Sequence, residues 1–261
     1  MATTEEMCTP YRVSTITANG CIGMMVALEQ FFQGVHIVDA MDPTAIGFTW
    51  VELEGQHRGE YIKKRRYTRK NVFSNQVTVL YRFRDGYMPN VKIFRNGNIQ
   101  MTGIKSHDDG RALVGVVADE IARITDQKAC PANQTFVVRM INGDFVVPFC
   151  IRRKELHQML MDDFHNTCCY QPENHPGVKL QYFWKNQDGI CRCAPACMGK
   201  GHNGECKKVT VLIFQSGKIL ITGATSLEQV TAAYAFICRV LIEHMDRIKW
   251  TPPVLPPQLI A

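Results

Sequence analysis

Closely spaced cysteines are the first residues in this chain whose types and spacing could do chemistry. Four cysteines and one histidine lie between positions 191 and 206: Cys191, Cys193, Cys197, His202 and Cys206. Four soft ligands suit a tetrahedral zinc ion. We therefore predict a zinc site held by the four cysteines, with His202 as an alternative ligand. Four protein ligands leave no open position for a catalytic water, so the zinc would be structural.

Two alternatives to zinc remain for the same cysteines. They could form disulfides, or they could be free thiols in an irregular loop. Disulfides are less favoured than zinc, because we expect the chain to be intracellular, where thiols stay reduced. The spacing alone does not choose among the three.

The second feature is a basic run, Lys63-Lys-Arg-Arg-Tyr-Thr-Arg-Lys70. Such a run can contact the phosphates of a nucleic acid, which makes affinity depend on salt. It can equally be a nuclear-targeting signal or a solvated loop. The candidate phosphate contacts are Lys63, Lys64, Arg65, Arg66, Arg69 and Lys70.

The remaining reactive residues do not indicate an enzyme. We find no Ser/His/Asp set and no phosphate-binding loop. Glu205 adjoins the cysteine cluster, but the chain lacks the signature in which a zinc deaminase carries its general acid/base. We expect no catalytic residues.

Bulk composition narrows the class further. The chain has 261 residues, 46% of them apolar, and a formal net charge of +6. This is enough for two small units with a real core, and the charge is compatible with a polyanionic partner. No apolar run is long enough for a membrane span, and the N-terminus lacks a signal-peptide pattern, so we expect an intracellular protein without a membrane partner.

An internal repeat sets the elements that must position these residues. Residues 91–106 (VKIFRNGNIQMTGIKS) match residues 211–226 (VLIFQSGKILITGATS) at eight positions without a gap. A repeat at this spacing indicates two copies of one structural unit. The chain therefore supplies its own two-fold relation, and we expect a monomer.

Each copy has the same predicted order of elements: strand, helix, antiparallel strands, helix. The first strands are 11–17 and 136–141, and apolar periodicity predicts helices over 24–32 and 156–164. Strands follow at 77–83, 91–94 and 99–103, and at 178–184, 209–214 and 218–222. Asn96-Gly97 and Ser216-Gly217 are typical of tight hairpin turns. Ser106 and Ser226 are predicted N-caps of the closing helices.

Strand alternation gives each predicted hairpin two faces. One face is uniformly apolar and should lie under the helices: Val91, Ile93, Ile99 and Met101, and Val211, Ile213, Ile219 and Ile221. The opposite face carries Lys92, Phe94, Gln100 and Thr102 in the first copy, and Leu212, Phe214, Leu220 and Thr222 in the second. Such a face is either covered by more protein or binds a partner, and we favour binding.

Three segments of the second half carry a resemblance to a known family. They are IFQSGKILITGA (213–224), FVVRMINGDFVVPFCIR (136–152) and YQPENHPG (170–177). The chain resembles the TATA-box-binding protein (TBP) family over about residues 10–250, and is most like the divergent TATA-binding-like proteins of large DNA viruses. The resemblance implies an α+β fold, a TBP-like saddle in which two pseudo-two-fold repeats form a curved antiparallel sheet with helices on the convex face.

The resemblance also implies the domain limits and the function. The first repeat would span 1–126, the second 127–250 with a Cys-rich insertion at 187–207, and a Pro-rich tail 251–261. The function implied is a transcription initiation factor that binds A·T-rich promoter DNA in the minor groove and bends it by inserting Phe side chains. Implied partners are double-stranded DNA, a transcription factor IIB-like protein and RNA polymerase, in the nucleus or at a site of viral transcription.

Residues carried over from the family form the predicted DNA-binding set. Phe73, Phe94, His175 and Phe214 match wedge positions, with His175 replacing an expected Phe. Thr102, Thr222, Leu212 and Leu220 match groove contacts, Lys92 and Gln100 replace apolar groove contacts in the first half, and Lys218 completes the set.

The departures from the family pattern leave a second interpretation open. Met140 occupies a position where the family has asparagine, and Lys92, Gln100 and His175 also depart. The alternative is a protein-interaction saddle of the transcription machinery with weak or non-specific DNA binding.

Overall fold

The computed structural model describes residues 7–60, 74–128, 130–186, 188–193, 197 and 206–250. Within these residues the chain divides into two compact units, one of residues 15–139 and one formed by the N-terminal segment to Ser14 together with the chain from Met140. Both divisions fall inside long strands, β1 (Arg12–Cys21) and β7 (Thr135–Val146). None of the described helices is long and apolar enough to cross a lipid bilayer.

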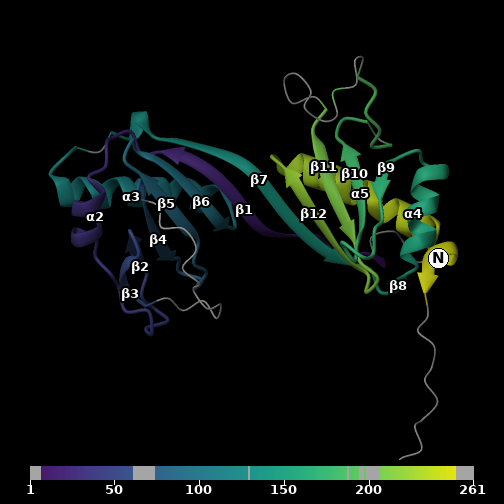
Figure 1. Ribbon diagram of the computed structural model, residues 1–261, viewed down its shortest axis with the longest axis horizontal. Coiled ribbons are helices and arrows are strands. Elements are labelled where there is room, and N and C mark those ends of the chain that lie inside the picture. Colours follow the sequence, from purple (N-terminus) through teal and green to yellow (C-terminus); the bar gives the residue numbers. More distant parts are fainter. Residues whose placement is uncertain are drawn as a thin grey trace, which may run out of the picture. The chain divides into compact units, whose positions relative to one another are not determined.

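The unit of residues 15–139 is an antiparallel sheet with helices on one face (Figure 1). Its strand order is β3-β2-β4-β5-β6-β1, and β2 (Gly47–Leu53), β3 (Gln56–Gly59), β4 (Gln76–Arg82), β5 (Asn90–Phe94) and β6 (Asn98–Ile104) join β1. Helix α3 (His107–Thr125) packs on β6, and α2 (Leu28–Gly34) packs on α3 and β2. A short 3-10 turn, η1 (Pro131–Asn133), precedes β7.

The other unit has the same plan. Its strand order is β7-β12-β11-β10-β9, with β9 (Thr167–Cys169), β10 (Val178–Phe183), β11 (Lys208–Ile213) and β12 (Lys218–Ala224). Helix α5 (Leu227–Glu243) packs on β11 and β12, and α4 (Arg153–Asp162) packs on β9 and β10. A two-stranded sheet of β8 (Cys150–Ile151) and β13 (Lys249–Trp250) and the short helix α6 (Met245–Ile248) complete it.

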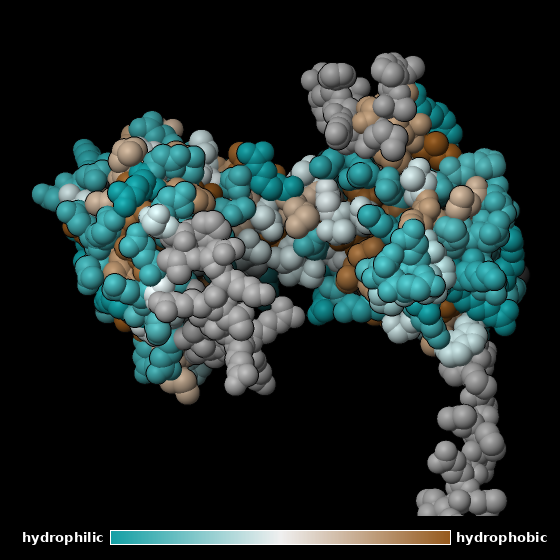
Figure 2. All heavy atoms as spheres, in the orientation of Figure 1, coloured by the Kyte–Doolittle hydropathy of each residue, from teal (hydrophilic) through white to brown (hydrophobic). Residues whose placement is uncertain are grey.

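The predicted two-faced hairpins are confirmed. The eight apolar residues assigned to the helix-facing side of β5, β6, β11 and β12 are all buried, between 0% and 2% exposed. Among the residues that the structure describes, few large apolar side chains remain exposed, and the view in Figure 2 is mostly hydrophilic or neutral. Burial of one complete apolar face explains why each strand pair keeps its register, since a one-residue slip would turn that face to water.

Glycines close both hairpins as the sequence indicated. Gly97 has φ +79° and Gly217 has φ +81°, a left-handed conformation that glycine adopts without steric cost. A Cβ atom on Gly97 would lie 2.1 Å from the Met24 carbonyl oxygen, and one on Gly217 would lie 2.5 Å from that of Val147. Each turn is therefore pressed against neighbouring backbone, which fixes Phe94 at the end of β5 and Phe214 directly after β11.

Serine N-caps start both long helices, as predicted. The Ser106 hydroxyl accepts from the Asp109 N–H at 3.1 Å, and Ser226 accepts from the Gln229 N–H at 3.4 Å. The Gln229 side-chain oxygen accepts from the Thr225 N–H at 2.8 Å, one residue earlier than a standard capping box requires. Ser226 is therefore the N-cap, but the Gln229 side chain binds the backbone N–H of the residue before it.

Two helix predictions were too long. Met24 precedes α2, which begins at Leu28, and Phe164 follows α4, which ends at Asp162. Met24 lies in the segment whose backbone contacts the β5–β6 turn, and the Val26 N–H donates to the Arg95 carbonyl at 2.9 Å. Met24 and Phe164 are apolar because they pack in the loops next to the helices. The apolar periodicity of the sequence therefore extended beyond the helical residues.

Candidate nucleic-acid interface

The face of each sheet that lies away from the helices is the candidate site. Directly opposed residues on neighbouring strands point to the same side. The register therefore shows which residues share a row across each open face, and the two units can be compared row by row.

In the unit of residues 15–139, one row is polar across four strands. Asn19 of β1 pairs with Gln100 of β6, Gln100 with Lys92 of β5, and Lys92 with Thr78 of β4. Gln100 is exposed, and the other three are half-buried. We call these four residues the polar row.

In the other unit, the matching row has an apolar centre. Asp144 of β7 pairs with Leu220 of β12, Leu220 with Leu212 of β11, and Leu212 with Lys179 of β10. Leu212 and Leu220 are half-buried. We call these four residues the leucine row. Leucines 212 and 220 stand where the polar row has Lys92 and Gln100.

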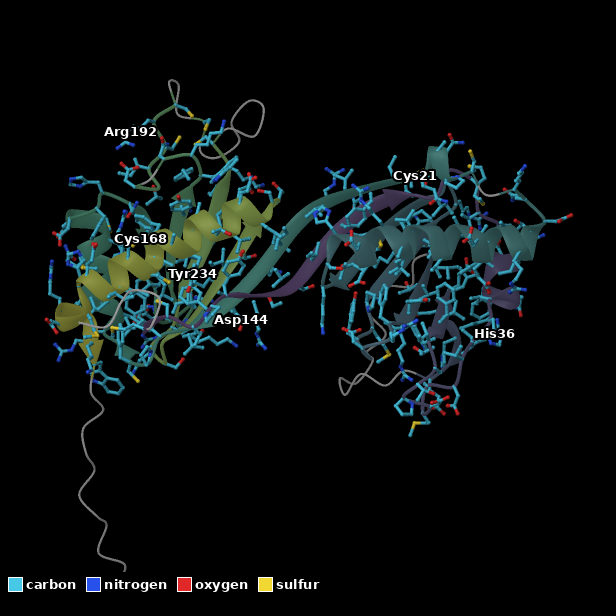
Figure 3. The ribbon with its side chains drawn as sticks, turned by 180° about the vertical axis from the view of Figure 1, so that it is seen from behind. Cys21, His36, Asp144, Cys168, Arg192 and Tyr234 are labelled. Atoms are coloured by element: carbon cyan, nitrogen blue, oxygen red, sulfur yellow. The ribbon has the colours of Figure 1, made fainter. Side chains whose placement is uncertain are left out.

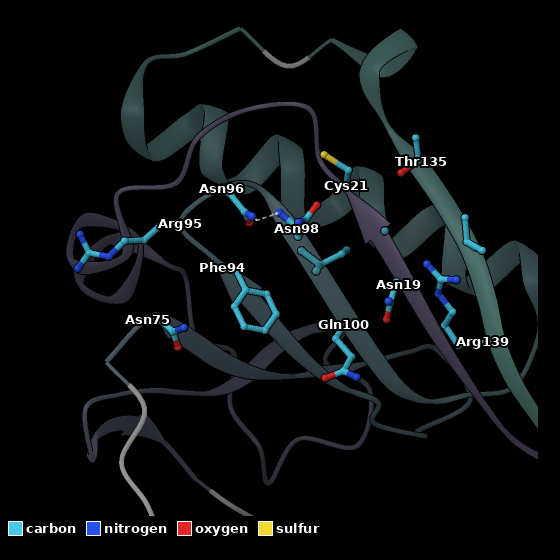
Figure 4. A pocket seen from close by; sticks show the side chains of 13 residues that line it. Asn19, Cys21, Asn75, Phe94, Arg95, Asn96, Asn98, Gln100, Thr135 and Arg139 are labelled. Atoms are coloured by element: carbon cyan, nitrogen blue, oxygen red, sulfur yellow. Dashed lines mark hydrogen bonds between the residues drawn. The ribbon is translucent and has the colours of Figure 1, made fainter.

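Phe94 borders an open hollow of about 690 Å³ within the unit of residues 15–139 (Figure 4). Its walls are mainly polar side chains from β1, β6, β7 and the β5–β6 turn, including Asn19, Gln100 and Arg139. With its amide oriented to satisfy both neighbours, Asn19 accepts from Arg139 Nε at 3.3 Å. The hollow places an aromatic ring beside several amide groups.

Phe214 lies beside His175, the two residues that the resemblance pairs as wedges. Their ring centroids are 5.8 Å apart, and the rings are inclined by 49°. The Gly177 N–H donates to His175 Nδ1 at 3.1 Å, and a Cβ on Gly177 would lie 3.2 Å from the Phe214 ring. Glycine at this position leaves room for both rings.

The two predicted threonines occupy equivalent positions with different surroundings. Thr102 is exposed, whereas Thr222 is half-buried, and its Oγ1 donates to Asn142 Oδ1 at 2.5 Å. Lys218, at the start of β12, is exposed. Phe73 and the basic residues Lys63, Lys64, Arg65, Arg66, Arg69 and Lys70 lie outside the described residues, as does the Pro-rich tail.

An ion pair on the open face was missed by sequence reasoning. Arg12 Nε lies 3.1 Å from both carboxylate oxygens of Asp144, whose side chain is 9% exposed while that of Arg12 is 76% exposed. Figure 3 labels Asp144 on β7. The leucine row therefore ends in a nearly buried carboxylate covered by a guanidinium.

The four cysteines of the predicted zinc site come together. The sulfur atoms of Cys191, Cys193, Cys197 and Cys206 all lie within 4.8 Å of one another. Cys191 and Cys197 sulfurs are 3.6 Å apart, and those of Cys193 and Cys197 are 3.3 Å apart. Four sulfurs bound at ~2.3 Å to a tetrahedral ion lie about 3.8 Å from each other. The set fits such an ion, whereas a disulfide needs sulfurs at ~2.05 Å.

The strands explain why these cysteines meet. The Trp184 N–H donates to the Lys207 carbonyl at 2.9 Å, which closes the ends of the insertion between β10 and β11. The Cys193 backbone N–H, with lesser contributions from the Cys206 and Cys197 thiols, lowers the pKa of Cys191 to about 6. Burial raises the pKa of Cys206 above its ordinary value. The cluster could hold a metal ion; His202 lies outside the described residues.

Four polar residues on the open faces were not predicted: Asn19, Arg139, Asn142 and Asp144. For three of them, the signal was available in the strands that carry them. In β1, Ala18 and Gly20 are buried and alternate with half-buried Thr17, Asn19 and Cys21. Extending the two-face argument from the hairpins to β1 would have found Asn19, and along β7 it would have found Asn142 and Asp144. Strict alternation would have placed Arg139 on the face of buried Ile141 and Gly143, so Arg139 could not be found in this way.

The chain is similar in sequence to known proteins. Residues 136–244 match the family model of transcription factor TFIID, also described as TATA-binding protein or TBP. The resemblance to the TATA-box-binding protein family is confirmed. A TATA-box-binding protein-like protein of Acanthamoeba polyphaga mimivirus is 27% identical over 92% of this chain and 67% of its own length. The TATA-box-binding protein of Dictyostelium discoideum is 28% identical over 84% of each chain.

A solved structure supports the TBP fold. The Methanococcus jannaschii TBP superposes with a TM-score of 0.54 at 17% identity and covers 90% of this chain and 99% of that one. The expected α+β class with a large antiparallel sheet is confirmed. The TBP family model covers the second repeat, while the viral relative and the archaeal structure extend the likeness over most of the chain.

Proposed function

We propose that this chain is a DNA-binding transcription initiation factor that binds A·T-rich promoter DNA in the minor groove. One observation carries the proposal: each unit leaves one sheet face clear of its helices, and the repeat puts Phe94 and Phe214, and Thr102 and Thr222, at equivalent positions there. The likeness to TBP favours DNA as the partner of these faces, since the similar proteins are named for binding the TATA box.

The chemistry of the leucine row suits this groove. A·T pairs present only acceptors there, so apolar and hydroxyl side chains meet no unsatisfied donor. TBP is itself the type case of apolar side chains wedging into the minor groove, so assigning that role to Phe94 and Phe214 carries the family's mechanism over. Unstacking costs a few kcal/mol per step, offset by contacts with the bent duplex.

His175 gives the second unit a weaker wedge. An imidazole ring stacks on a base but buries less apolar surface than a phenyl ring. Phe214 would then perform most of the unstacking at its end of the site. The bend produced there should be smaller than a pair of phenyl rings would give.

A structural zinc ion in the cysteine cluster belongs to the same proposal. Cys191, Cys193, Cys197 and Cys206 would hold it, and it would order the insertion between β10 and β11. Partners in the proposal are a transcription factor IIB-like protein and RNA polymerase. The protein would act as a monomer, without enzymatic activity, in the nucleus or at a site of viral transcription.

Fluorescence anisotropy with short A·T-rich and G·C-rich duplexes tests the proposal. The A·T-rich duplex should bind more tightly, and the Phe94→Ala/Phe214→Ala double variant should lose that difference. A matched control is Met161→Ala/Leu227→Ala, because these side chains on α4 and α5 are 46% and 48% exposed and lie on helices. Equal binding of both duplexes by the wild-type protein, or no binding, would refute it.

A protein-interaction surface with weak DNA binding is the second candidate, and the Arg12–Asp144 ion pair favours it. A nearly buried carboxylate on the open face repels phosphates, although the guanidinium beside it reduces that repulsion. Purely salt-driven binding without base preference, together with unchanged binding by the double Phe variant, would support this second candidate.

A further inference from the structure

We infer that the two units read the minor groove differently: the polar row accepts the guanine amino group, and the leucine row excludes it. The inference rests on the proposed function and deepens it. It assigns to the unit of residues 15–139 the ability to bind G·C as well as A·T pairs. Strict A·T preference is then confined to the other unit.

In the minor groove, a G·C pair differs from an A·T pair by one hydrogen-bonding group. A·T and T·A pairs show only the acceptors adenine N3 and thymine O2, and a G·C pair adds the guanine N2 amino donor. A surface that rejects G·C must leave this donor without an acceptor. A surface that tolerates G·C must provide one.

The leucine row has no acceptor at its centre. Leu212 and Leu220 pair directly across β11 and β12. Their methyl groups would cover a guanine amino group and remove its water without replacing the hydrogen bond, which is unfavourable for a buried donor. Leu212 and Leu220 therefore select against a G·C pair that lies directly on them.

The polar row provides what the leucine row lacks. Gln100 is exposed on β6, and its side-chain oxygen can accept from an amino group while its nitrogen donates to adenine N3 or thymine O2. Asn19 lies directly opposite Gln100 and lines the same hollow, so a second amide borders the position (Figure 4). The Lys92 ammonium, directly across from Gln100 on β5, adds a donor for the groove acceptors.

Room for the amino group is also present. The hollow of about 690 Å³ beside Phe94 has Asn19, Gln100 and Asn98 in its walls. It is open, and polar and apolar groups line it in about equal measure. An added amino group on a base edge can therefore enter it on the side of these amide groups.

Modified bases isolate the amino group from every other feature of the base pair. In 2,6-diaminopurine paired with thymine, an A·T pair gains the minor-groove amino group of guanine. The probe is a short duplex with an A·T-only core between G·C ends, in which single adenines are replaced by 2,6-diaminopurine. The ratio of dissociation constants, modified to unmodified, is measured at each position by anisotropy.

The wild-type protein should show two classes of position. In one part of the core the substitution should cost about tenfold in affinity, as a mismatched contact typically does, and in the other part less than about twofold. The Gln100→Leu/Lys92→Leu variant should raise the small penalties to about tenfold. The reciprocal Leu220→Gln/Leu212→Lys variant should lower the large ones, which also assigns each part of the core to its unit.

The outcomes separate this inference from the proposed function. Uniform penalties along the core, or penalties that neither variant changes, would overturn the inference while A·T-rich binding stands. Failure of the wild-type protein to bind the unmodified core would overturn the proposed function itself. Thermal unfolding of each variant shows whether a changed ratio comes from the row or from loss of the fold.

Discussion

Replacing Gly97 by alanine should destabilise the protein much more than replacing Gly86, although the two glycines have nearly the same backbone conformation. Gly97 has φ +79° and Gly86 has φ +80°. Around Gly86 nothing lies within 4 Å of an added Cβ, whereas at Gly97 that atom would lie 2.1 Å from the Met24 carbonyl oxygen. The pair therefore separates conformational cost from steric cost.

The magnitude follows from the contacts of the β5–β6 turn. A left-handed alanine costs about 1–2 kcal/mol, and the reduced freedom of the unfolded chain returns about 0.4–1 kcal/mol. Gly86→Ala should therefore cost about 1 kcal/mol. At Gly97 the backbone must also shift, which endangers the 2.9 Å bond from the buried Ile22 N–H to the Gly97 carbonyl. An unsatisfied buried donor adds about 1–3 kcal/mol, so Gly97→Ala should cost about 3 kcal/mol.

Urea unfolding of both variants measures the difference. The midpoints are compared at a common slope, which converts the shift into a difference in free energy of unfolding. Values for the two variants that agree within about 0.5 kcal/mol, the usual error of such comparisons, would refute the steric reasoning. Because the Gly97 N–H donates to the Phe94 carbonyl at 3.0 Å, Gly97→Ala should also weaken duplex binding.

Two further predictions concern the cysteine cluster and the ion pair. Because the pKa of Cys191 is lowered to about 6, its thiolate predominates at pH 7 in metal-free protein. Its alkylation rate, followed by mass spectrometry against the exposed Cys130, should rise through pH 6, and zinc should suppress it. A rate that rises only near the ordinary cysteine value of about 8.5 would contradict this. Asp144→Asn should strengthen duplex binding and steepen its salt dependence by about 0.9, because Arg12 becomes free to contact a phosphate. The unfolding midpoint should change little, since the pair is largely exposed on the Arg12 side, and unchanged affinity and salt slope would show that the pair lies away from DNA.

The hairpins were predictable because several local signals agreed. Alternation gave the faces of β5, β6, β11 and β12, and Asn96-Gly97 and Ser216-Gly217 gave the turns. The repeat added a second, independent copy of the same evidence. Where pattern, turn and repetition coincide, sequence reasoning specifies both the elements and the side that each residue faces.

The β2–β3 hairpin was not predicted, for an identifiable reason. Residues 48–51 are buried in succession, so this part of β2 shows no alternation. Its turn uses Glu54 at φ 50° before Gly55 at φ 81°, and the non-glycine residue conceals the turn. A strand covered on both faces cannot be distinguished from a short helix by periodicity.

The site was partly predictable. The open-face residues of the hairpins follow from alternation, but the hydrogen bonds that link Thr222 to Asn142 and Arg12 to Asp144 join residues far apart in sequence. The convergence of four sulfurs likewise depends on the pairing of β10 with β11. Long-range register, which no local pattern contains, decides these contacts.

Under the proposed function, the unequal rows would give a bound duplex a direction. Two identical halves in one chain would read a site and its reversed copy equally well, so such a protein could not tell upstream from downstream. Here Gln100 and Lys92 in one unit stand where Leu220 and Leu212 stand in the other. Divergence after duplication would thus supply polarity: the order of tolerant and strict steps along the promoter would decide which way the bound protein points, and with it the strand to be transcribed.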